Sequence, residues 1–233
     1  MSLYLSRLRL SRAPSSRALD ALLNPGDEAR RIDAHHRLLW AVFSDGPDRD
    51  RDFLWRQEGP GVFLTLSSRL PAAHDLFESP EVRDFAPVLA AGQRLAFRLR
   101  ANATRTEKTG AMSAGGKEKK RHVDLVMDTL KSIPSGERAA ERMAAAQRAA
   151  TAWLAGQGER SGFDLLGAAV EDYSTVALPG HRGPRSGQPQ FGILDIAGEI
   201  ELRDPGAFLP RLAQGFGRAK AFGCGLMLIR RGG

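Results

Sequence analysis

The amino-acid sequence predicts an α+β fold in which the order β-α-β-β-α-β occurs twice along 233 residues. Three observations support this prediction. Residues 3–10 alternate with a period of two, residues 25–43 repeat apolar side chains at helical spacing, and residues 53–67 hold two short apolar runs around a Gly-Pro-Gly turn. That order of elements defines a ferredoxin-like unit. We therefore expect two tandem ferredoxin-like domains, over residues 1–93 and 94–233.

The first half should contain a strand, a long helix and a hairpin before its last elements. The helix is expected to start at Asn24-Pro25, because Asn is a favoured cap and Pro a favoured first helical residue, and to end near residue 43. Ile32, Leu39 and Phe43 form its apolar stripe. The other elements expected here are strands at 3–10, 53–57 and 62–67, a second helix at 80–90 and a strand at 94–101.

The second half starts with a stretch of different composition. Residues 102–122 are rich in Lys and Arg and should form a loop or a mobile hairpin. The predicted strand at 94–101 would have to be both the last strand of the first domain and the first strand of the second, unless the two domains share it or it is longer than predicted. The elements expected later are a short helix at 124–133, a long helix from Ser135 to about residue 155 with Ala139, Met143, Ala146, Ala150 and Trp153 buried, strands at 165–178 and 191–202, a helix at 208–217 and a strand at 225–230.

The chain is basic, with 34 Lys and Arg against 27 Asp and Glu, a net charge of +7 and a sequence pI near 10.1. This balance favours a polyanionic partner. Cys224 is the only cysteine, which excludes an internal disulfide and a multi-cysteine zinc site and indicates a reducing compartment. No apolar run approaches the ~18 residues of a membrane span, and no His-x-x-x-His or Cys-x-x-Cys occurs. We expect no metal, no cofactor and no membrane partner.

Residues 215–228 bring four glycines, at 215, 217, 223 and 225, together with Arg218 and Lys220. Glycine permits a positive φ and a close backbone approach, and the two cations could bind a phosphate. A nucleotide-binding P-loop runs from strand to loop to helix, whereas this segment runs from a predicted helix to a predicted strand. A P-loop is therefore disfavoured, and a turn that only closes the fold is the plainer alternative.

The segment Gly-Phe-Gly-Arg-Ala-Lys-Ala-Phe-Gly-Cys-Gly-Leu resembles the glycine-rich signature of the CRISPR-associated endoribonucleases that process CRISPR precursor RNA. Its Ala-Lys-x-x-Gly-Cys-Gly-Leu core is similar to the type I-E branch, the CasE subunit of Cascade. Residues 3–10, 35–40 and 97–102 agree in the same order, so the resemblance spans the chain. It implies tandem ferredoxin-like domains, metal-independent cleavage of a CRISPR repeat stem-loop, other Cascade subunits as partners, and a cytoplasmic location.

Cleavage of RNA without a metal needs a group that takes a proton from the 2′-hydroxyl, and histidine titrates in the right range. His36 lies four residues before Trp40, as in the His-x-x-x-Trp segment of the family, so the resemblance implies that His36 is the general acid/base. By spacing alone His36 falls close to the apolar stripe, where a hydrogen-bonded core histidine is common, and His35 is the fallback. Asp33 stands where some relatives carry tyrosine, so the second acid/base stays open.

Basic residues in three segments are candidates for contacts with RNA phosphates. The glycine-rich loop matches the family's phosphate-contacting segment, arginines flank the strand at 94–101, and the 102–122 stretch could order on a phosphate backbone, although such runs are often only solvated surface. The candidates are Lys220, Arg218, Gly217 and Gly223; Arg98, Arg100 and Arg105; and Lys117, Lys119, Lys120 and Arg121, with Arg182 and Arg185 as weaker ones.

The leading hypothesis is thus a metal-independent endoribonuclease that leaves a 2′,3′-cyclic phosphate and retains the mature guide RNA. Two alternatives stay open. One is a non-catalytic scaffold subunit of the same fold that binds an RNA hairpin. The other is an enzyme that uses the glycine-rich loop for a mononucleotide.

Overall fold

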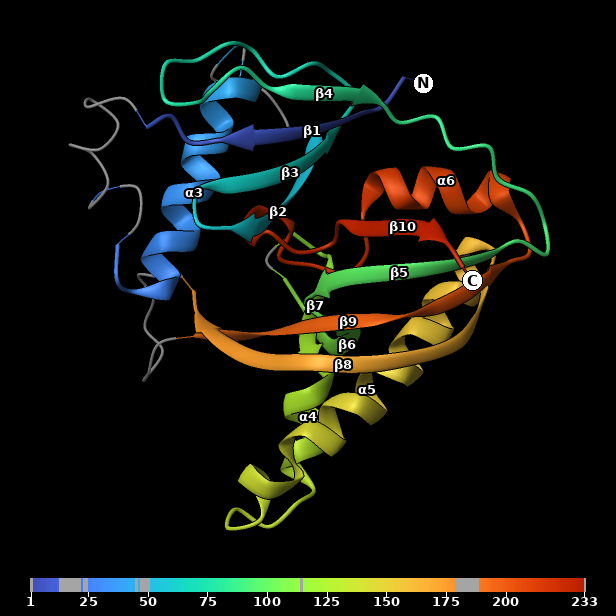
Figure 1. The fold of residues 1–233 in the computed structure, drawn as a ribbon. Coiled ribbons are helices and arrows are strands. Elements are labelled where there is room, and N and C mark those ends of the chain that lie inside the picture. The colour runs from blue at the N-terminus through green and yellow to red at the C-terminus, as the bar shows by residue number, and fades with distance from the viewer. Residues whose placement is uncertain are drawn as a thin grey trace.

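The computed structural model describes residues 2–12, 22, 25–44, 46, 51–113, 115–178 and 189–232. Within them the chain forms two four-stranded antiparallel sheets and a separate two-stranded hairpin (Figure 1). The first sheet has the order β2-β3-β1-β4 and the second has the order β10-β5-β9-β8. Their strands are β1 (Tyr4–Arg9), β2 (Phe53–Gly59), β3 (Val62–Ser67), β4 (Glu81–Asp84), β5 (Arg94–Ala101), β8 (Phe163–Ala177), β9 (Gln190–Leu202) and β10 (Met227–Arg231).

Each sheet has the strand order of a ferredoxin-like unit. The first strand of each set along the chain, β1 or β5, lies inside its sheet between the third and fourth strands of that set. Both of its neighbours run antiparallel to it. The prediction of two tandem ferredoxin-like units is therefore confirmed, while the division of the chain at residues 93 and 94 stays a prediction.

The helix α3 (Glu28–Phe43) covers one face of the first sheet (Figure 1). It begins later than Asn24-Pro25, because the Asp27 carboxylate caps it by accepting a hydrogen bond from the backbone N–H of Arg30 at 2.8 Å. Leu39, Val42 and Phe43 share a buried cluster with aromatic residues of β2 and β3. This packing fixes which side of α3 faces the sheet.

The second helix predicted at residues 80–90 does not form, and that prediction is wrong. Residues 81–84 form the edge strand β4, which pairs with β1 in the register Tyr4↔Asp84. Arg9 on β1 donates two hydrogen bonds to Glu81, at 3.0 and 3.2 Å. Pro87 lies inside the segment, where it would break a helix, and the edge of β1 offers cross-strand pairing instead. Because β4 closes the first sheet, β5 belongs to the second sheet alone.

The helices α5 (Arg138–Ser161) and α6 (Pro205–Gln214) pack with the second sheet in the larger core. Phe163 of β8 meets Phe208 of α6 edge to face, with ring centroids 5.8 Å apart. Leu54 and Leu66 of the first sheet join this core, whereas α3 and the aromatic residues of β2 and β3 form a separate cluster. Ala139 and Met143 are exposed, contrary to the prediction, because the start of α5 extends beyond the sheet (Figure 1).

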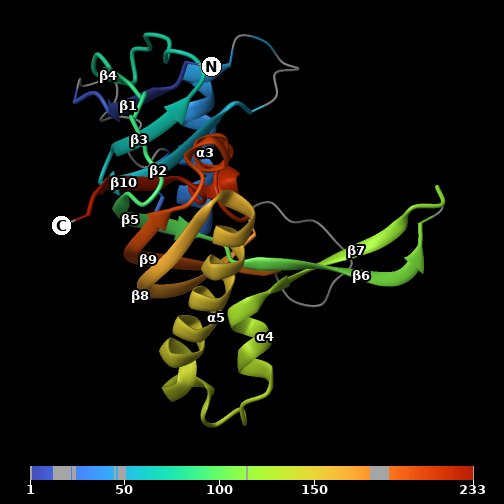
Figure 2. The same ribbon diagram turned by 90° about the vertical axis from the view of Figure 1, so that its right-hand side faces the viewer.

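The stretch predicted as a loop or hairpin is a hairpin, here called the arm. It consists of β6 (Thr104–Met112) and β7 (Glu118–Asp124), and Figure 2 shows it projecting away from both sheets. The short helix α4 (Leu125–Lys131) follows β7. The Asp124 carboxylate caps α4 and also accepts the backbone N–H of Gly192 on β9, at 3.0 Å, which ties the root of the arm to the second sheet.

No helix among the described ranges is both long and apolar enough to span a membrane.

Candidate functional site

His36 is half-buried on α3, with its ring edge-on to Trp40 at a centroid distance of 6.2 Å. Its Nε2 atom is buried and has no hydrogen-bond partner within the described ranges. Burial lowers the pKa of His36 below its ordinary 6.5, the nearby charges of Arg51 and Arg37 lower it further, and Asp33 opposes them. The imidazole is therefore neutral near pH 7 and can accept a proton.

His35 lies on the core side of the same helix. Its side chain is fully buried and packs edge-on against Phe63, with centroids 4.9 Å apart. Consecutive residues on a helix point about 100° apart, so one histidine enters the core while its neighbour stays partly accessible. Asp33 forms an ion pair with Arg37 at 2.9 Å, which engages its carboxylate with a guanidinium one turn along α3.

The glycine-rich loop runs from α6 through a short 3₁₀ turn, η1 (Lys220–Phe222), into β10. Gly215 and Gly217 have φ values of 79° and 76°, which disfavour any residue with a side chain. A Cβ atom on Gly215 would lie 2.8 Å from Leu54 of the first sheet, and one on Gly217 would lie 2.6 Å from the Asn102 carbonyl oxygen. At Gly223 a Cβ would lie 3.3 Å from Trp55. Because these glycines lack side chains, the loop fits closely between the two sheets.

The glycine-rich loop fixes the position of Lys220. Its Nζ donates a hydrogen bond of 2.6 Å to the Gln214 carbonyl oxygen at the end of α6. Burial lowers the pKa of Lys220, as do the charges of Arg211 and Arg51. The neighbouring Ala219 packs in the same cluster as Ala29 and Ile32 of α3. The loop from the end of the chain therefore contacts the helix that carries His36.

A cleft of ≈ 450 Å³ lies between the first sheet and α6. Lys220 and Arg51 line it together with apolar side chains that include Leu54, Leu66 and Pro210. Arg51 was not a candidate in the sequence, because it stands among alternating Asp and Arg residues that indicate only a charged loop. Its position beside Lys220 depends on tertiary packing.

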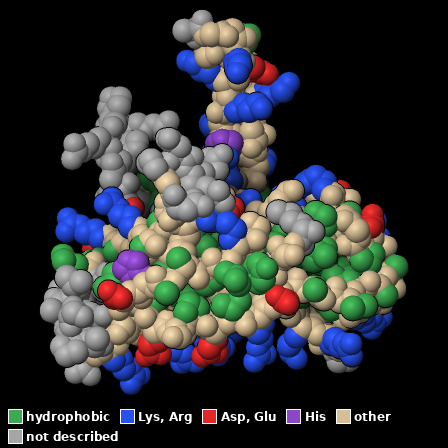
Figure 3. Space-filling model, turned by 90° about the horizontal axis from the view of Figure 1, so that it is seen from above, with side chains coloured by type: hydrophobic (Ala, Val, Ile, Leu, Met, Phe, Trp, Pro, Cys, Tyr) green, Lys and Arg blue, Asp and Glu red, His purple; other side chains and the backbone are tan. Residues whose placement is uncertain are grey.

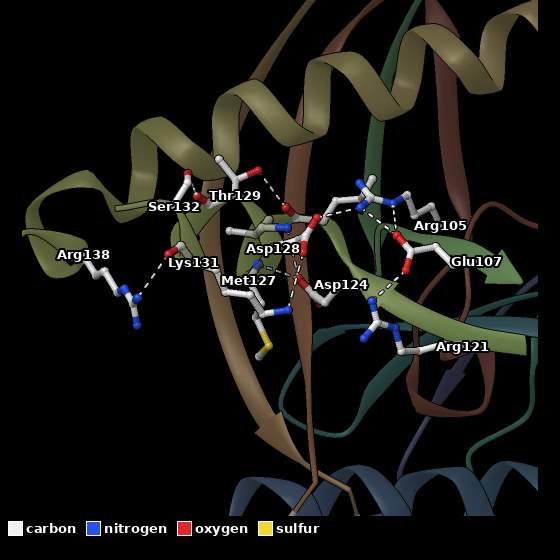
Figure 4. Close-up of polar contacts among 12 residues, drawn as sticks. Arg105, Glu107, Arg121, Asp124, Met127, Asp128, Thr129, Lys131, Ser132 and Arg138 are labelled. Atoms are coloured by element: carbon white, nitrogen blue, oxygen red, sulfur yellow. Dashed lines mark hydrogen bonds and ion pairs between the residues drawn. The ribbon is translucent and has the colours of Figure 1, made fainter. Parts of the chain in front are cut away.

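One side of the arm is neutralised by ion pairs (Figure 4). Glu107 accepts hydrogen bonds from Arg105 and Arg121, each at 2.8 Å. Arg105 also bonds Asp128 of α4, at 2.8 Å. Two of the predicted RNA contacts, Arg105 and Arg121, thus already have carboxylate partners.

The other side of the arm holds two opposed lysines and is here called its cationic side. Lys108 and Lys120 lie directly opposite each other in the β6–β7 register, although Lys108 also approaches Glu118 at 3.4 Å. Like charges in this position repel, unless an anion lies between them. Next along this side, Thr106 and His122 are hydrogen-bonded at 3.1 Å. Figure 3 shows Lys and Arg side chains along the length of the arm.

Arg218 extends this cationic side toward the body of the protein. Its side chain is exposed, and its backbone N–H bonds the Asn102 carbonyl oxygen at 3.3 Å. Burial and then the charges of Arg218 and Lys120 lower the pKa of His122, so the two cations share one region. Lys117 and Lys119 near the tip have no ion pair to a carboxylate in the part of the arm that is described.

Arg98 and Arg100 lie on the face of the second sheet away from α5. Arg100 forms hydrogen bonds of 2.6 and 3.0 Å with Asp195, which raise its pKa. Arg98 approaches Glu171 at 3.5 Å. Acidic partners therefore offset both charges. Arg182 and Arg185 lie outside the described residues.

Comparisons with known proteins agree with this geometry. A family model described as "CRISPR associated protein" matches residues 3–231. The chain is 28% identical over 232 residues to "CRISPR-associated endoribonuclease Cse3" of Thermus thermophilus, covering 89% of this chain and 96% of the relative. It is 26% identical over 204 residues to "CRISPR system Cascade subunit CasE" of Escherichia coli, covering 83% and 89%.

A solved structure, "CRISPR endoribonuclease Cse3 bound to 19 nt RNA", superposes with a TM-score of 0.64 at 25% identity and covers 99% of this chain and 100% of that one. The family resemblance noted in the sequence is thus confirmed over nearly the whole length. The chain belongs to the CRISPR-associated protein family.

Proposed function

We propose that this protein is an endoribonuclease that cuts CRISPR repeat hairpins in precursor RNA and keeps the mature guide RNA as a subunit of Cascade. Its family membership supports this, as do relatives named an endoribonuclease and a Cascade subunit. The proposal rests on the half-buried imidazole of His36, whose pKa is lowered, and on the packing of the glycine-rich loop with Lys220 against the same helix, α3. A neutral base and a cation are the groups that this reaction needs.

The reaction follows from those groups. The 2′-oxygen attacks the adjacent phosphorus, so the bond from 2′-oxygen to phosphorus forms as the bond from phosphorus to the 5′-oxygen breaks. The 2′-hydroxyl proton passes to His36, and the departing 5′-oxygen takes a proton from solvent. Lys220 stabilises the charge on the non-bridging oxygens. The products are a 2′,3′-cyclic phosphate and a 5′-hydroxyl, and the step uses no metal ion.

The choice of His36 over His35 rests on access. His35 is fully buried against Phe63, whereas His36 is only half-buried and lies within reach of the charge of Arg51. A general base must approach the proton that it removes. We therefore assign the base to His36 alone.

The arm is proposed to bind the stem of the repeat hairpin. Its cationic side, with Lys108 and Lys120 opposed, would take the phosphate backbone between them, and Arg218 would continue the contact toward the cleft. Phosphate contacts fix register and orientation. Lys117, Lys119 and Lys120 of the arm are then more effective RNA contacts than Arg105 and Arg121, whose charges are already paired.

A purified-protein assay tests the proposal. The protein is incubated with a repeat hairpin in excess EDTA, and the product ends are mapped; a matched hairpin with a 2′-deoxy residue at the cut site serves as the control. We expect one cut, a cyclic phosphate end and no cleavage of the control. Binding without cleavage would favour the scaffold alternative, for which the buried Nε2 atom of His36 is the supporting observation. Loss of cleavage in EDTA would contradict the metal-independent mechanism.

We also propose that the protein acts in the cytoplasm, where its RNA substrate would be made, and that retention of the product keeps turnover close to one cut per molecule.

A further inference from the structure

Arg51 is a half-buried arginine just before β2 whose charge the proposed reaction has not yet used. It lines the cleft of ≈ 450 Å³ together with Lys220. No carboxylate is paired with it in the described part of the chain. The adjacent carboxylate, Asp52, bonds Arg69 at 2.6 and 3.0 Å instead.

Two other buried or partly buried arginines have acidic partners, and Arg211 bonds the side-chain oxygen of Gln157. Arg100 is paired with Asp195, and Arg56 with Glu58, each at 2.6 Å. A guanidinium withdrawn from water without a counterion is unfavourable, so such groups in proteins normally have a partner. Arg51 and Lys220 line one cleft, although two cations side by side repel each other. A polyanion bound in the cleft would satisfy both.

We propose that Arg51 binds the scissile phosphate of the RNA opposite Lys220 and stabilises the negative charge that develops on its non-bridging oxygens. This inference rests on the proposed function, and it names a residue that the sequence did not reveal. The guanidinium can donate two parallel hydrogen bonds to one phosphate, a geometry that the ammonium of Lys220 lacks.

Arg51 has a second effect, on His36. The charged groups that act on His36 are Arg51, Arg37 and Asp33, of which the first two lower its pKa. Removing the charge of Arg51 should therefore raise the pKa of His36 toward its ordinary value. Because the base is active only when neutral, the acidic limb of the cleavage rate should then move to higher pH.

The test compares Arg51→Gln and Arg51→Lys with the wild type, with Arg148→Ala on the exposed surface of α5 as the control. Single-turnover cleavage of the repeat hairpin is measured without metal across pH. Loss of one such donor typically costs about 10²–10³-fold in rate, and we expect a loss of this size for Arg51→Gln, a smaller one for Arg51→Lys and none for Arg148→Ala. The midpoint of the acidic limb should rise in Arg51→Gln.

A second measurement separates this inference from the proposed function. The affinity for the 2′-deoxy hairpin is followed against salt, where one lost phosphate contact should reduce the log–log slope by about 0.7–0.9. If Arg51→Gln cuts at the wild-type rate with an unchanged pH midpoint while His36→Ala is inactive, the inference is wrong and the proposed function stands. If the wild type binds the hairpin but never cuts it, the proposed function fails. The salt dependence of binding then tests Arg51 by itself. A smaller slope for Arg51→Gln than for the wild type supports the phosphate contact of Arg51, and an equal slope overturns it. Thermal unfolding confirms that each variant is folded, and Arg51→Lys replaces Arg51→Gln if the latter is not.

Discussion

Arg51 and Lys220 of the cleft are half-buried, whereas Lys108 and Lys120 of the arm are exposed and Arg100 of β5 is paired with Asp195. Charges at an exposed surface are screened within about 8 Å at physiological salt. Those in a partly dry cleft act more strongly on what is bound there. The number of cations in a region therefore says less about its role than their burial and their pairing.

This difference assigns separate tasks to the two regions. The cleft should control the rate of the chemical step, because its charges and His36 act on the reacting phosphate. The arm should control affinity and its dependence on salt, because its cations contact the backbone away from the cut. Four sets of variants test whether the two tasks are separate.

His36→Ala should have the largest effect. General base catalysis typically contributes about 10²–10⁴-fold, and we expect a loss in that range in the single-turnover rate, with the affinity for the 2′-deoxy hairpin unchanged. His74→Ala, on a loop of the first half, is the control. Cleavage by His36→Ala at the wild-type rate would show that His36 is not the general base.

Lys220→Ala should slow the same step by about 10²-fold, because it removes one cation from the reacting phosphate while Arg51 remains. Lys220→Arg keeps the charge and should recover part of the rate. A variant whose affinity falls while its rate at saturating RNA stays normal would move Lys220 from the chemical step to binding. The cleft and the arm would then both act on affinity, and their proposed separate tasks would be contradicted.

Lys108→Ala combined with Lys120→Ala should weaken binding without changing the rate at saturating RNA. Each lost phosphate contact should reduce the slope of log affinity against log salt by about 0.7–0.9. Lys131→Ala on α4, which is paired with Asp128, is the matched control. An unchanged slope in the double variant would exclude the cationic side of the arm from the RNA interface.

Arg100→Ala should have the smallest effect on RNA. The variant leaves Asp195, a mostly buried carboxylate, without its guanidinium, and should lose about 1–3 kcal/mol of stability. Cleavage rate and affinity should stay within about twofold, as for most surface changes away from a site. Thermal unfolding and the hairpin assay measure the two quantities. A large loss of affinity in a folded variant would show that the face of β5 binds RNA.

Much of the fold could be predicted because its signals are local. The alternation in β1, the Gly-Pro turn between β2 and β3 and the apolar stripe of α3 each lie within one segment. The glycine-rich loop was recognised for the same reason. The helix predicted at residues 80–90 does not form, because β4 pairs with β1 instead. The β1 residues that it contacts, Tyr4 and Arg9, lie more than 70 positions away in the sequence.

Composition and short-range patterns in the sequence were sufficient for most of the element order, the basic balance and the glycine-rich loop, and the sequence motifs carried the resemblance to the family. The three-dimensional arrangement was needed to show which of two adjacent histidines is accessible, which arm cations are already paired with Glu107, and that Arg51 lies beside Lys220. The physical reason is that burial and ion pairing depend on which segments meet in space. That meeting is fixed by sheet register and core packing, which no single stretch of the chain contains.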